Sequence, residues 1–218
     1  MGIKGASSRN VTIAGAVIVV ALIAAAIGYQ QVRRPKLTPE LNGYELAQKL
    51  GCFACHGPGG TGGVPNPGSD EREVPAWDGG NAMMYVENEE EIREWILFGH
   101  PKRLEEDHEN HSHGSPDQRP LLSMPAFEGV VSDRDLESLV AYYKVVAAFD
   151  PVPPEVRPGY SVASKNGCFG CHGPRGLVGT SNPRSFKGYI PPWRGDDYRE
   201  LVQSETELRQ WILEGRVD

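Results

Sequence analysis

The sequence has few of the residues from which large hydrophobic cores are built. Hydrophobic side chains make up 39% of the 218 residues, and aromatic ones only 8%. Glycine and proline are instead frequent, at 26 and 18 residues. No segment shows the alternating pattern of a half-buried strand, so a sheet-based fold is not expected. The composition is typical of compact, loop-rich domains that need support from something other than a large apolar core.

An excess of basic residues is also missing. The net charge of −7 speaks against nucleic acid as a partner. The charge is unevenly distributed, because residues 37–150 contain eight basic and 21 acidic side chains, whereas residues 151–218 contain nine and eight. An acidic first part would attract a partner with a basic docking face. An acidic surface that only keeps the protein soluble explains the same count.

Charge is absent altogether from residues 10–32. At about 1.5 Å per residue, a helix of this length crosses the ~30 Å hydrocarbon layer of a bilayer. We therefore expect a cytoplasmic N-terminus at residues 1–9, a transmembrane anchor at 10–32 and a juxtamembrane linker at 33–37. The alternative is a cleaved signal peptide, since Ala24–Ala26 fits its small-residue cleavage pattern. The apolar run is longer than a usual signal peptide requires, and either interpretation exports the rest of the chain.

The remainder of the chain contains a duplication. A shift of 116 residues aligns 42–100 with 158–216 without gaps, and 27 of the 59 aligned positions are identical. A proline-rich linker at 150–158 joins the copies and should act as a semi-rigid spacer. The sequence thus predicts two tandem domains, at 38–149 and 159–218.

Helix signals recur within these domains. Thr38, Asn88 and Ser132 are expected to cap helices that run to about Leu50, over Glu89–Phe98 and to about Ala148. The predicted fold class is therefore all-α. Short helices joined by long glycine- and proline-rich loops would fold poorly unless they enclose a large apolar group.

Each copy contains a Cys-x-x-Cys-His motif. The motifs consist of Cys52, Cys55 and His56 in the first copy, and of Cys168, Cys171 and His172 in the second. A redox dithiol or a disulfide needs no histidine, and a four-cysteine zinc site would have to join two separate repeats. Covalently bound haem uses every residue of the motif, because two thioethers hold the porphyrin and the histidine ligates the iron. We therefore expect two haem c groups, bound through the four cysteines, with His56 and His172 as iron ligands.

With these motifs, each repeat resembles a class I cytochrome c domain, and the resemblance covers about 180 of the 218 residues. The family has a helix before the motif, a middle helix, a ligand methionine on a loop and a closing helix. The resemblance implies that Met124, in Ser-Met-Pro-Ala-Phe, is the sixth ligand of the first iron. The alternative for a single methionine is packing in the core. Met83 and Met84 have no counterparts in the second repeat.

The second repeat contains no methionine where the family places one. The counterpart of Met124 would lie near position 240, and the sequence given ends at Asp218. We expect a continuation there that supplies the ligand and the closing helix, so that the second domain is incomplete as given. The alternatives are an open iron site, a partner subunit that closes the pocket, or a histidine from the first domain.

Other side chains are candidates for additional sites. His108, His111 and His113 could bind a transition metal or change the charge of their loop with pH. We prefer the simpler interpretation, in which they belong to a solvated, flexible insertion. His100 aligns with Arg216, and both could meet a haem propionate. Trp77 and Trp193 could donate to propionates or could simply pack in the core.

The tandem arrangement with an anchor resembles the dihaem cytochrome c subunit of bc-type quinol-oxidising complexes. It also resembles cytochrome subunits of haem-copper oxidases. The resemblance implies an electron carrier rather than an enzyme, anchored in the inner membrane with its haem domains on the periplasmic side. Its expected partners are a cytochrome b, Rieske or oxidase subunit and a downstream carrier, reaction centre or oxidase. The alternative activity is that of a dihaem peroxidase with an open second iron.

Overall fold

The computed structural model describes residues 8–78, 80–105 and 120–215. Within this part the chain is mostly helical, as expected, and it divides into two compact units. One unit consists of residues 1–36 and 181–189, and the other of residues 37–180 and 190–218. The positions at which the two sequence repeats begin and end remain predictions.

The first element, α1, is a helix over Ser8–Arg33 that contains the expected segment 10–32. Its described side chains are exposed along its whole length. Its stretch Ile13–Arg33 is long and apolar enough to cross a membrane, with a mean hydropathy of 2.2 in its most apolar window. A signal sequence near the N-terminus would have the same length and composition.

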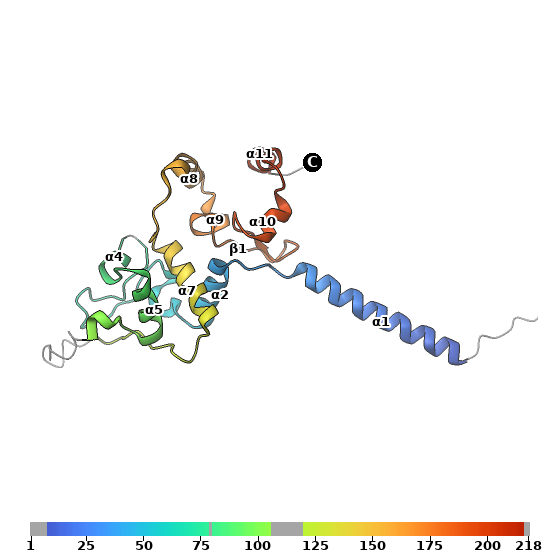
Figure 1. Ribbon diagram of the computed structural model, residues 1–218, viewed down its shortest axis with the longest axis horizontal. Coiled ribbons are helices and arrows are strands. Elements are labelled where there is room, and N and C mark those ends of the chain that lie inside the picture. Colours follow the sequence, from blue (N-terminus) through green and yellow to red (C-terminus); the bar gives the residue numbers. More distant parts are fainter. Residues whose placement is uncertain (1–7, 79, 106–119, 216–218) are drawn as a thin grey trace, which may run out of the picture. The chain divides into compact units, whose positions relative to one another are not determined.

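The first repeat consists of short helices joined by loops (Figure 1). They are α2 (Pro39–Lys49), α3 (Phe53–His56), η1 (Pro58–Gly60), α4 (Ala82–Tyr85), α5 (Glu89–Phe98), η2 (Lys102–Leu104) and α7 (Asp133–Val146). The side chains of Thr38, Asn88 and Ser132 each accept a hydrogen bond from an amide in the first turn of the helix that follows. The three predicted caps are thus confirmed. The predicted helix ends are accurate to two residues.

Helices α2 and α7 lie side by side, and a glycine allows their close approach (Figure 1). A Cβ atom at Gly43 of α2 would overlap the main-chain carbonyl of Ser138 and approach Tyr142 on α7. Asn42 donates to the Ser138 hydroxyl across the same contact, at 2.9 Å. Because two backbones can meet this closely only where one residue has no side chain, Gly43 determines where the helices cross.

A small apolar cluster joins α5 to α7. Its buried members are Val86, Ile92, Leu136 and Val140. Trp95, Ile96 and Tyr143 pack against it. Ile92, Trp95 and Ile96 therefore form the apolar face of α5. This cluster positions the two helices that lie on either side of the methionine loop.

The second repeat has its elements in the same register. They are η4 (Pro154–Val156), α8 (Arg157–Lys165), α9 (Phe169–His172), η5 (Pro174–Gly176), β1 (Thr180–Ser181), β2 (Tyr189–Ile190), α10 (Asp196–Leu201) and α11 (Glu205–Glu214). Helices α9 and α11 lie 116 residues after α3 and α5.

Two details differ from the expectation. The predicted extended spacer at 150–158 becomes helical from Pro154 onward, because Pro158 near the start of α8 is compatible with a first helical turn. The two-residue strands β1 and β2 form a minimal ladder that the sequence did not indicate, and Pro65 and Glu73 form the matching bridge in the first repeat.

The second repeat is the more open one. A Cβ at Gly159, the counterpart of Gly43, would meet nothing within 4 Å. Trp211 is 38% exposed and Leu213 is 79% exposed, whereas their counterparts Trp95 and Leu97 pack against the α5–α7 cluster. Within the described residues, nothing covers α8 and α11 as α7 covers α2 and α5.

Candidate functional site

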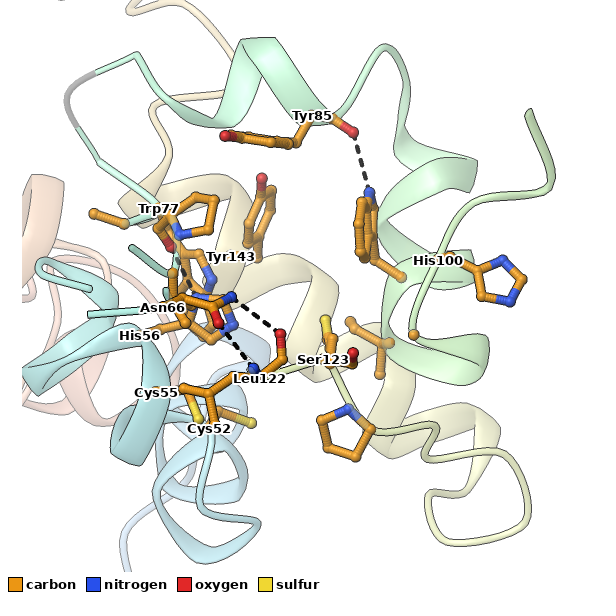
Figure 2. Close-up of a pocket in the computed structure, with 18 of the residues that line it drawn as sticks. Cys52, Cys55, His56, Asn66, Trp77, Tyr85, His100, Leu122, Ser123 and Tyr143 are labelled. Atoms are coloured by element: carbon orange, nitrogen blue, oxygen red, sulfur yellow. Dashed lines mark hydrogen bonds between the residues drawn. The ribbon is translucent and has the colours of Figure 1, made fainter. Parts of the chain in front are cut away.

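A cavity of about 1600 Å³ lies within the first repeat. Four of the predicted site residues line it: Cys52, Cys55, His56 and Met124. They come from one short helix and from a loop that follows 68 residues later. Figure 2 shows Cys52, Cys55 and His56 grouped on one side of the cavity. The structure therefore brings together all the candidate ligands of the first repeat.

The motif residues are presented by a single helical turn. The amide of Cys52 donates to the carbonyl of Ala47 at 3.0 Å, which joins the turn to the end of α2. The amide of His56 then donates to the carbonyl of Cys52 at 3.0 Å. The second repeat forms the same two bonds, at the same lengths, from Cys168 and His172. The local sequence therefore produces the same presentation of two thiols and one imidazole twice.

The imidazole of His56 is held by a backbone carbonyl. Its Nδ1 lies 2.9 Å from the carbonyl oxygen of Pro75. A carbonyl can only accept a hydrogen bond, so Nδ1 carries the proton. Burial lowers the pKa of His56, against the opposing effect of the Pro75 carbonyl, and so favours the neutral ring. The neutral ring has its lone pair on Nε2, which is the state that a metal requires.

The environment of Cys52 does not favour a reactive dithiol. None of the four cysteines, all of which the structure describes, is joined in a disulfide. Burial raises the pKa of Cys52, with a smaller contribution from Cys55. Reactive dithiols depend on a lowered thiol pKa, because the thiolate is the nucleophile. Among the described residues there is also no cluster of three or more histidine, cysteine or acidic side chains that suits a metal ion.

A buried asparagine holds the loop that carries Met124. The side-chain amide of Asn66 donates to the carbonyl of Leu122 at 3.0 Å, and its oxygen accepts from the amide of Leu122 at 2.8 Å (Figure 2). The amide of Leu121 also donates to the carbonyl of Pro67, at 3.0 Å. These bonds span more than 50 residues of sequence. The pair of bonds from Asn66 fixes the backbone two residues before Met124.

The other side of the loop rests on the end of α5. The amides of Phe127 and Glu128 donate to the carbonyl of Leu97 at 3.1 and 3.0 Å. Leu97 belongs to the last turn of α5, where the backbone carbonyls have no hydrogen-bond partners within the helix. Met124 is therefore held between two anchored points, one on each side.

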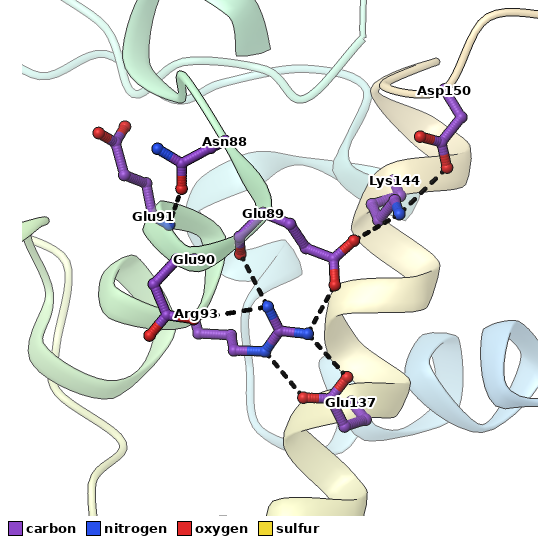
Figure 3. Close-up of polar contacts among 8 residues, drawn as sticks. All are labelled: Asn88, Glu89, Glu90, Glu91, Arg93, Glu137, Lys144 and Asp150. Carbon is purple, nitrogen blue, oxygen red and sulfur yellow. Dashed lines mark hydrogen bonds and ion pairs between the residues drawn. The ribbon is translucent and has the colours of Figure 1, made fainter.

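Helix α5 is in turn tied to α7 by charged side chains (Figure 3). Arg93 contacts Glu89 of its own helix at 2.6 Å and Glu137 of α7 at 2.8 Å. Lys144 of α7 contacts Glu89 at 2.6 Å and Asp150 at 3.1 Å. Hydrogen bonds from Lys144 and then Arg93 lower the pKa of Glu89, and the bond from Arg93 lowers that of Glu137. This network supports the helix on which the methionine loop rests.

Aromatic side chains form much of the cavity wall. Trp77 lies with its ring centroid 5.0 Å from that of His56 and 5.6 Å from that of Tyr143. Burial raises the pKa of Tyr143 to about 12, so its hydroxyl stays protonated at neutral pH. The hydroxyl of Tyr142 donates to the carbonyl of Gly59 at 2.9 Å. Trp77 thus packs against the motif histidine, and its suggested contact with a propionate stays a prediction.

The second repeat shows half of this arrangement. His172 lies 2.9 Å from the carbonyl of Pro191, and its ring centroid lies 5.3 Å from that of Trp193. Cys171 is exposed and Cys168 is half-buried. No methionine follows this motif in the sequence given, and so no counterpart of Met124 joins these residues.

The remaining candidates give a mixed result. His100 lines the first cavity, and Figure 2 places it on the side opposite His56. Its aligned partner Arg216 lies outside the described residues, as do His108, His111 and His113. Met83 and Met84 are exposed on α4, at 78% and 62%, and do not line the cavity. This contrast favours Met124 among the methionines.

The sequence did not identify every residue that builds the site. The main omissions are Asn66 and three tyrosines of the cavity wall, Tyr85, Tyr142 and Tyr143. A signal for Asn66 existed, because Asn66-Pro67 recurs as Asn182-Pro183 in the second repeat. No comparable signal marks the tyrosines, since the sequence given has no second copy of the segment that carries two of them.

Comparison with known proteins gave no match, whether with protein-family models, with curated proteins or with solved structures.

Proposed function

We propose that the chain is a membrane-anchored dihaem cytochrome c that transfers electrons. The observation that carries the proposal is the repeated motif geometry. In both repeats a Cys-x-x-Cys-His turn presents its imidazole with Nδ1 bonded to the carbonyl 19 residues later. In the first repeat this turn borders a large aromatic-walled cavity that also receives Met124.

The residues of the first cavity suit haem c. Cys52 and Cys55 would form the two thioethers, since a thiol adds to a vinyl group without an oxidant. His56 would ligate the iron through Nε2, and Met124 through its sulfur. Thioether sulfur is a soft ligand that favours reduced iron. When bound, haem c supplies a carrier of single electrons.

The protein side chains then set the conditions for transfer. The Pro75 carbonyl holds the His56 ring in one tautomer, and Asn66 positions the loop of Met124. Trp77, Tyr85 and Tyr143 line the cavity with aromatic rings, which would exclude water once haem fills it. A dry site with two fixed ligands keeps coordination unchanged between oxidation states and leaves no position for a substrate.

The second site would use Cys168, Cys171 and His172 in the same way. Helix α1 would hold both groups at a membrane, on the side where haem is attached, which we propose is the periplasmic side of the inner membrane. The expected electron partners are a bc-type complex or a haem-copper oxidase on one side and a carrier or reaction centre on the other. The many acidic residues of 37–150 favour a partner with a basic face.

A dihaem peroxidase is the second candidate. It is favoured by the greater exposure of the second motif, where Cys171 is exposed whereas Cys55 is half-buried. An iron ligated by His172 alone would bind small ligands. Carbon monoxide added to the reduced protein distinguishes the two, because a fully six-coordinate carrier gives no spectral response.

Haem content tests the proposal directly. The purified full-length protein should have the mass of the polypeptide plus two haem groups and give c-type bands in a pyridine haemochrome assay. The matched variants Cys52→Ser/Cys55→Ser and Cys168→Ser/Cys171→Ser should each retain one haem. A wild-type mass equal to that of the bare polypeptide would overturn the proposal.

A further inference from the structure

The turn at Asn182–Gly188 forms the same hydrogen bonds as the turn at Asn66–Arg72. In each, the serine hydroxyl donates to the asparagine carbonyl, at 2.9 Å from Ser185 and 2.8 Å from Ser69. In each, the asparagine amide donates to the carbonyl six residues later, at 2.8 Å. The final residue of both turns has a positive φ, 59° for Arg72 and 79° for Gly188. The repeats therefore preserve the hydrogen bonds of the turn, although Gly68 has a positive φ of 89° and the matching Arg184 does not.

The residues at the tips of the turns are opposite in character. The first turn carries Asp70 and Glu71 at its tip, and the second carries Phe186 and Lys187 at the same positions. Phe186 is 53% exposed. The hydrogen bonds of the turn do not require either pair of tip residues. The replacement of two acidic residues by an aromatic and a basic one therefore indicates that the two turns meet different surroundings.

The second tip packs against the end of α1. The guanidinium Nε of Arg33 donates to the carbonyl of Phe186 at 2.7 Å. The rings of Tyr29 and Phe186 meet edge to face, with centroids 6.2 Å apart. The Arg33 guanidinium lies 5.6 Å from the Tyr29 ring centroid and 5.8 Å from that of Phe186. These contacts join residues 181–189 and the first 36 residues into one compact unit.

All the charged residues near the contact between α1 and the second turn are basic. Between residues 29–36 and 181–189 there are five basic residues and no acidic one. They are Arg33, Arg34, Lys36, Arg184 and Lys187. Two aromatic rings and a basic cluster therefore lie at the C-terminal end of an apolar helix. Aromatic residues favour the headgroup level of a bilayer, and basic clusters beside a membrane segment attract anionic lipids.

We propose that the end of α1 and the turn at 181–189 form one membrane-interface site for anionic phospholipids. Phe186 lies at the headgroup level beside Tyr29. The lipid phosphates are held by Arg184 and Lys187 of the turn and by the three basic residues at the end of α1 and just after it. The proposal rests on α1 remaining in the membrane, as the proposed function requires. It adds a second, lipid-specific attachment that the anchor alone does not predict.

Hydrogen exchange of the full-length protein in nanodiscs tests this site. One set of discs contains phosphatidylcholine alone, and the other contains about 30 mol% phosphatidylglycerol. We expect exchange at residues 182–190 to slow by about fivefold or more in the anionic discs, and to return to the neutral value in about 1 M salt, where screening is strong. The turn at 66–74 serves as an internal control and should not respond.

Two variants separate the lipid contact from the packing contact. Phe186→Asp/Lys187→Glu installs the tip of the first repeat and should abolish the response. Arg184→Gln/Lys187→Gln keeps the ring contact and should reduce the response by at least about fivefold. Asp70→Asn/Glu71→Gln, in the other turn, should leave it unchanged.

Three outcomes would overturn the proposal. They are equal exchange in both kinds of disc, an equal response of both turns, or a mature N-terminus that lies after Ala26. The readout does not depend on haem. The mass of the same sample reports haem attachment separately, so the failure of one proposal is distinguishable from the failure of the other.

Discussion

The two repeats share a motif turn and differ in what encloses it. In the first, α7 crosses α2 at Gly43, and the Met124 loop closes the cavity between α5 and the turn at residue 66. In the second, the counterparts Gly159, Arg209 and Trp211 are present, but within the described residues they have few packing partners. The comparison shows that the motif turn depends only on its local sequence, whereas the cavity requires elements that lie far along the chain.

The largest difference between the repeats should appear at the crossing glycines. Gly43→Ala places a methyl group against the Ser138 backbone and should destabilise the protein by about 3 kcal/mol, at the upper end for overpacked cores. Gly159→Ala meets open space and should be neutral or stabilise α8 by up to about 1 kcal/mol, since alanine favours a helix. Thermal unfolding followed by circular dichroism gives both values. Equal losses would mean that α8 is covered in solution as α2 is.

A smaller difference is expected at the paired asparagines. Asn66→Ala removes both hydrogen bonds to Leu122 and should cost about 2 kcal/mol, with faster hydrogen exchange at 121–126. Asn182→Ala, at the matching position, should cost about 0.5 kcal/mol or less, since a change away from such contacts has little effect. If Asn66→Ala left exchange at 121–126 unchanged, the two bonds from Asn66 to Leu122 would not be what positions Met124.

The smallest difference concerns the paired arginines. Arg93 is 22% exposed and bonds to both helices, whereas Arg209 is 70% exposed and contacts Glu205 of its own helix. Arg93→Gln should cost about 1 kcal/mol at pH 7, and Arg209→Gln about 0.3 kcal/mol.

The cost of losing Arg93 should depend on pH. The pKa values of Glu89 and Glu137 are lowered in the folded protein, so their contribution is present above the unfolded value of 4.5. It is lost as the pH falls below 4.5 and the carboxylates become protonated. Denaturant unfolding at several pH values should therefore show the Arg93→Gln deficit shrinking in acid. A deficit that stays constant would assign the loss to packing.

The features that could be predicted from the sequence were those set by neighbouring residues. Thr38, Asn88 and Ser132 cap their helices because a cap needs only an amide two or three residues away. The register of α11 followed from the repeat. The pair of hydrogen bonds between Asn66 and Leu122 could not be predicted. The two residues lie 56 positions apart, and the geometry of the bonds depends on the packing of α5 and α7. Figure 3 shows why that packing is specific, since single arginine and lysine side chains bridge the two helices.

The 19-residue spacing between the motif histidine and its proline carbonyl limits how the chain can change in length. The spacing is the same in both repeats, from His56 to Pro75 and from His172 to Pro191. Yet only seven of the 18 intervening residues are identical. Side chains there have been replaced freely, while no insertion or deletion separates the copies. An added residue would have to loop out before the carbonyl, or it would move the acceptor away from the ring and release the imidazole to rotate.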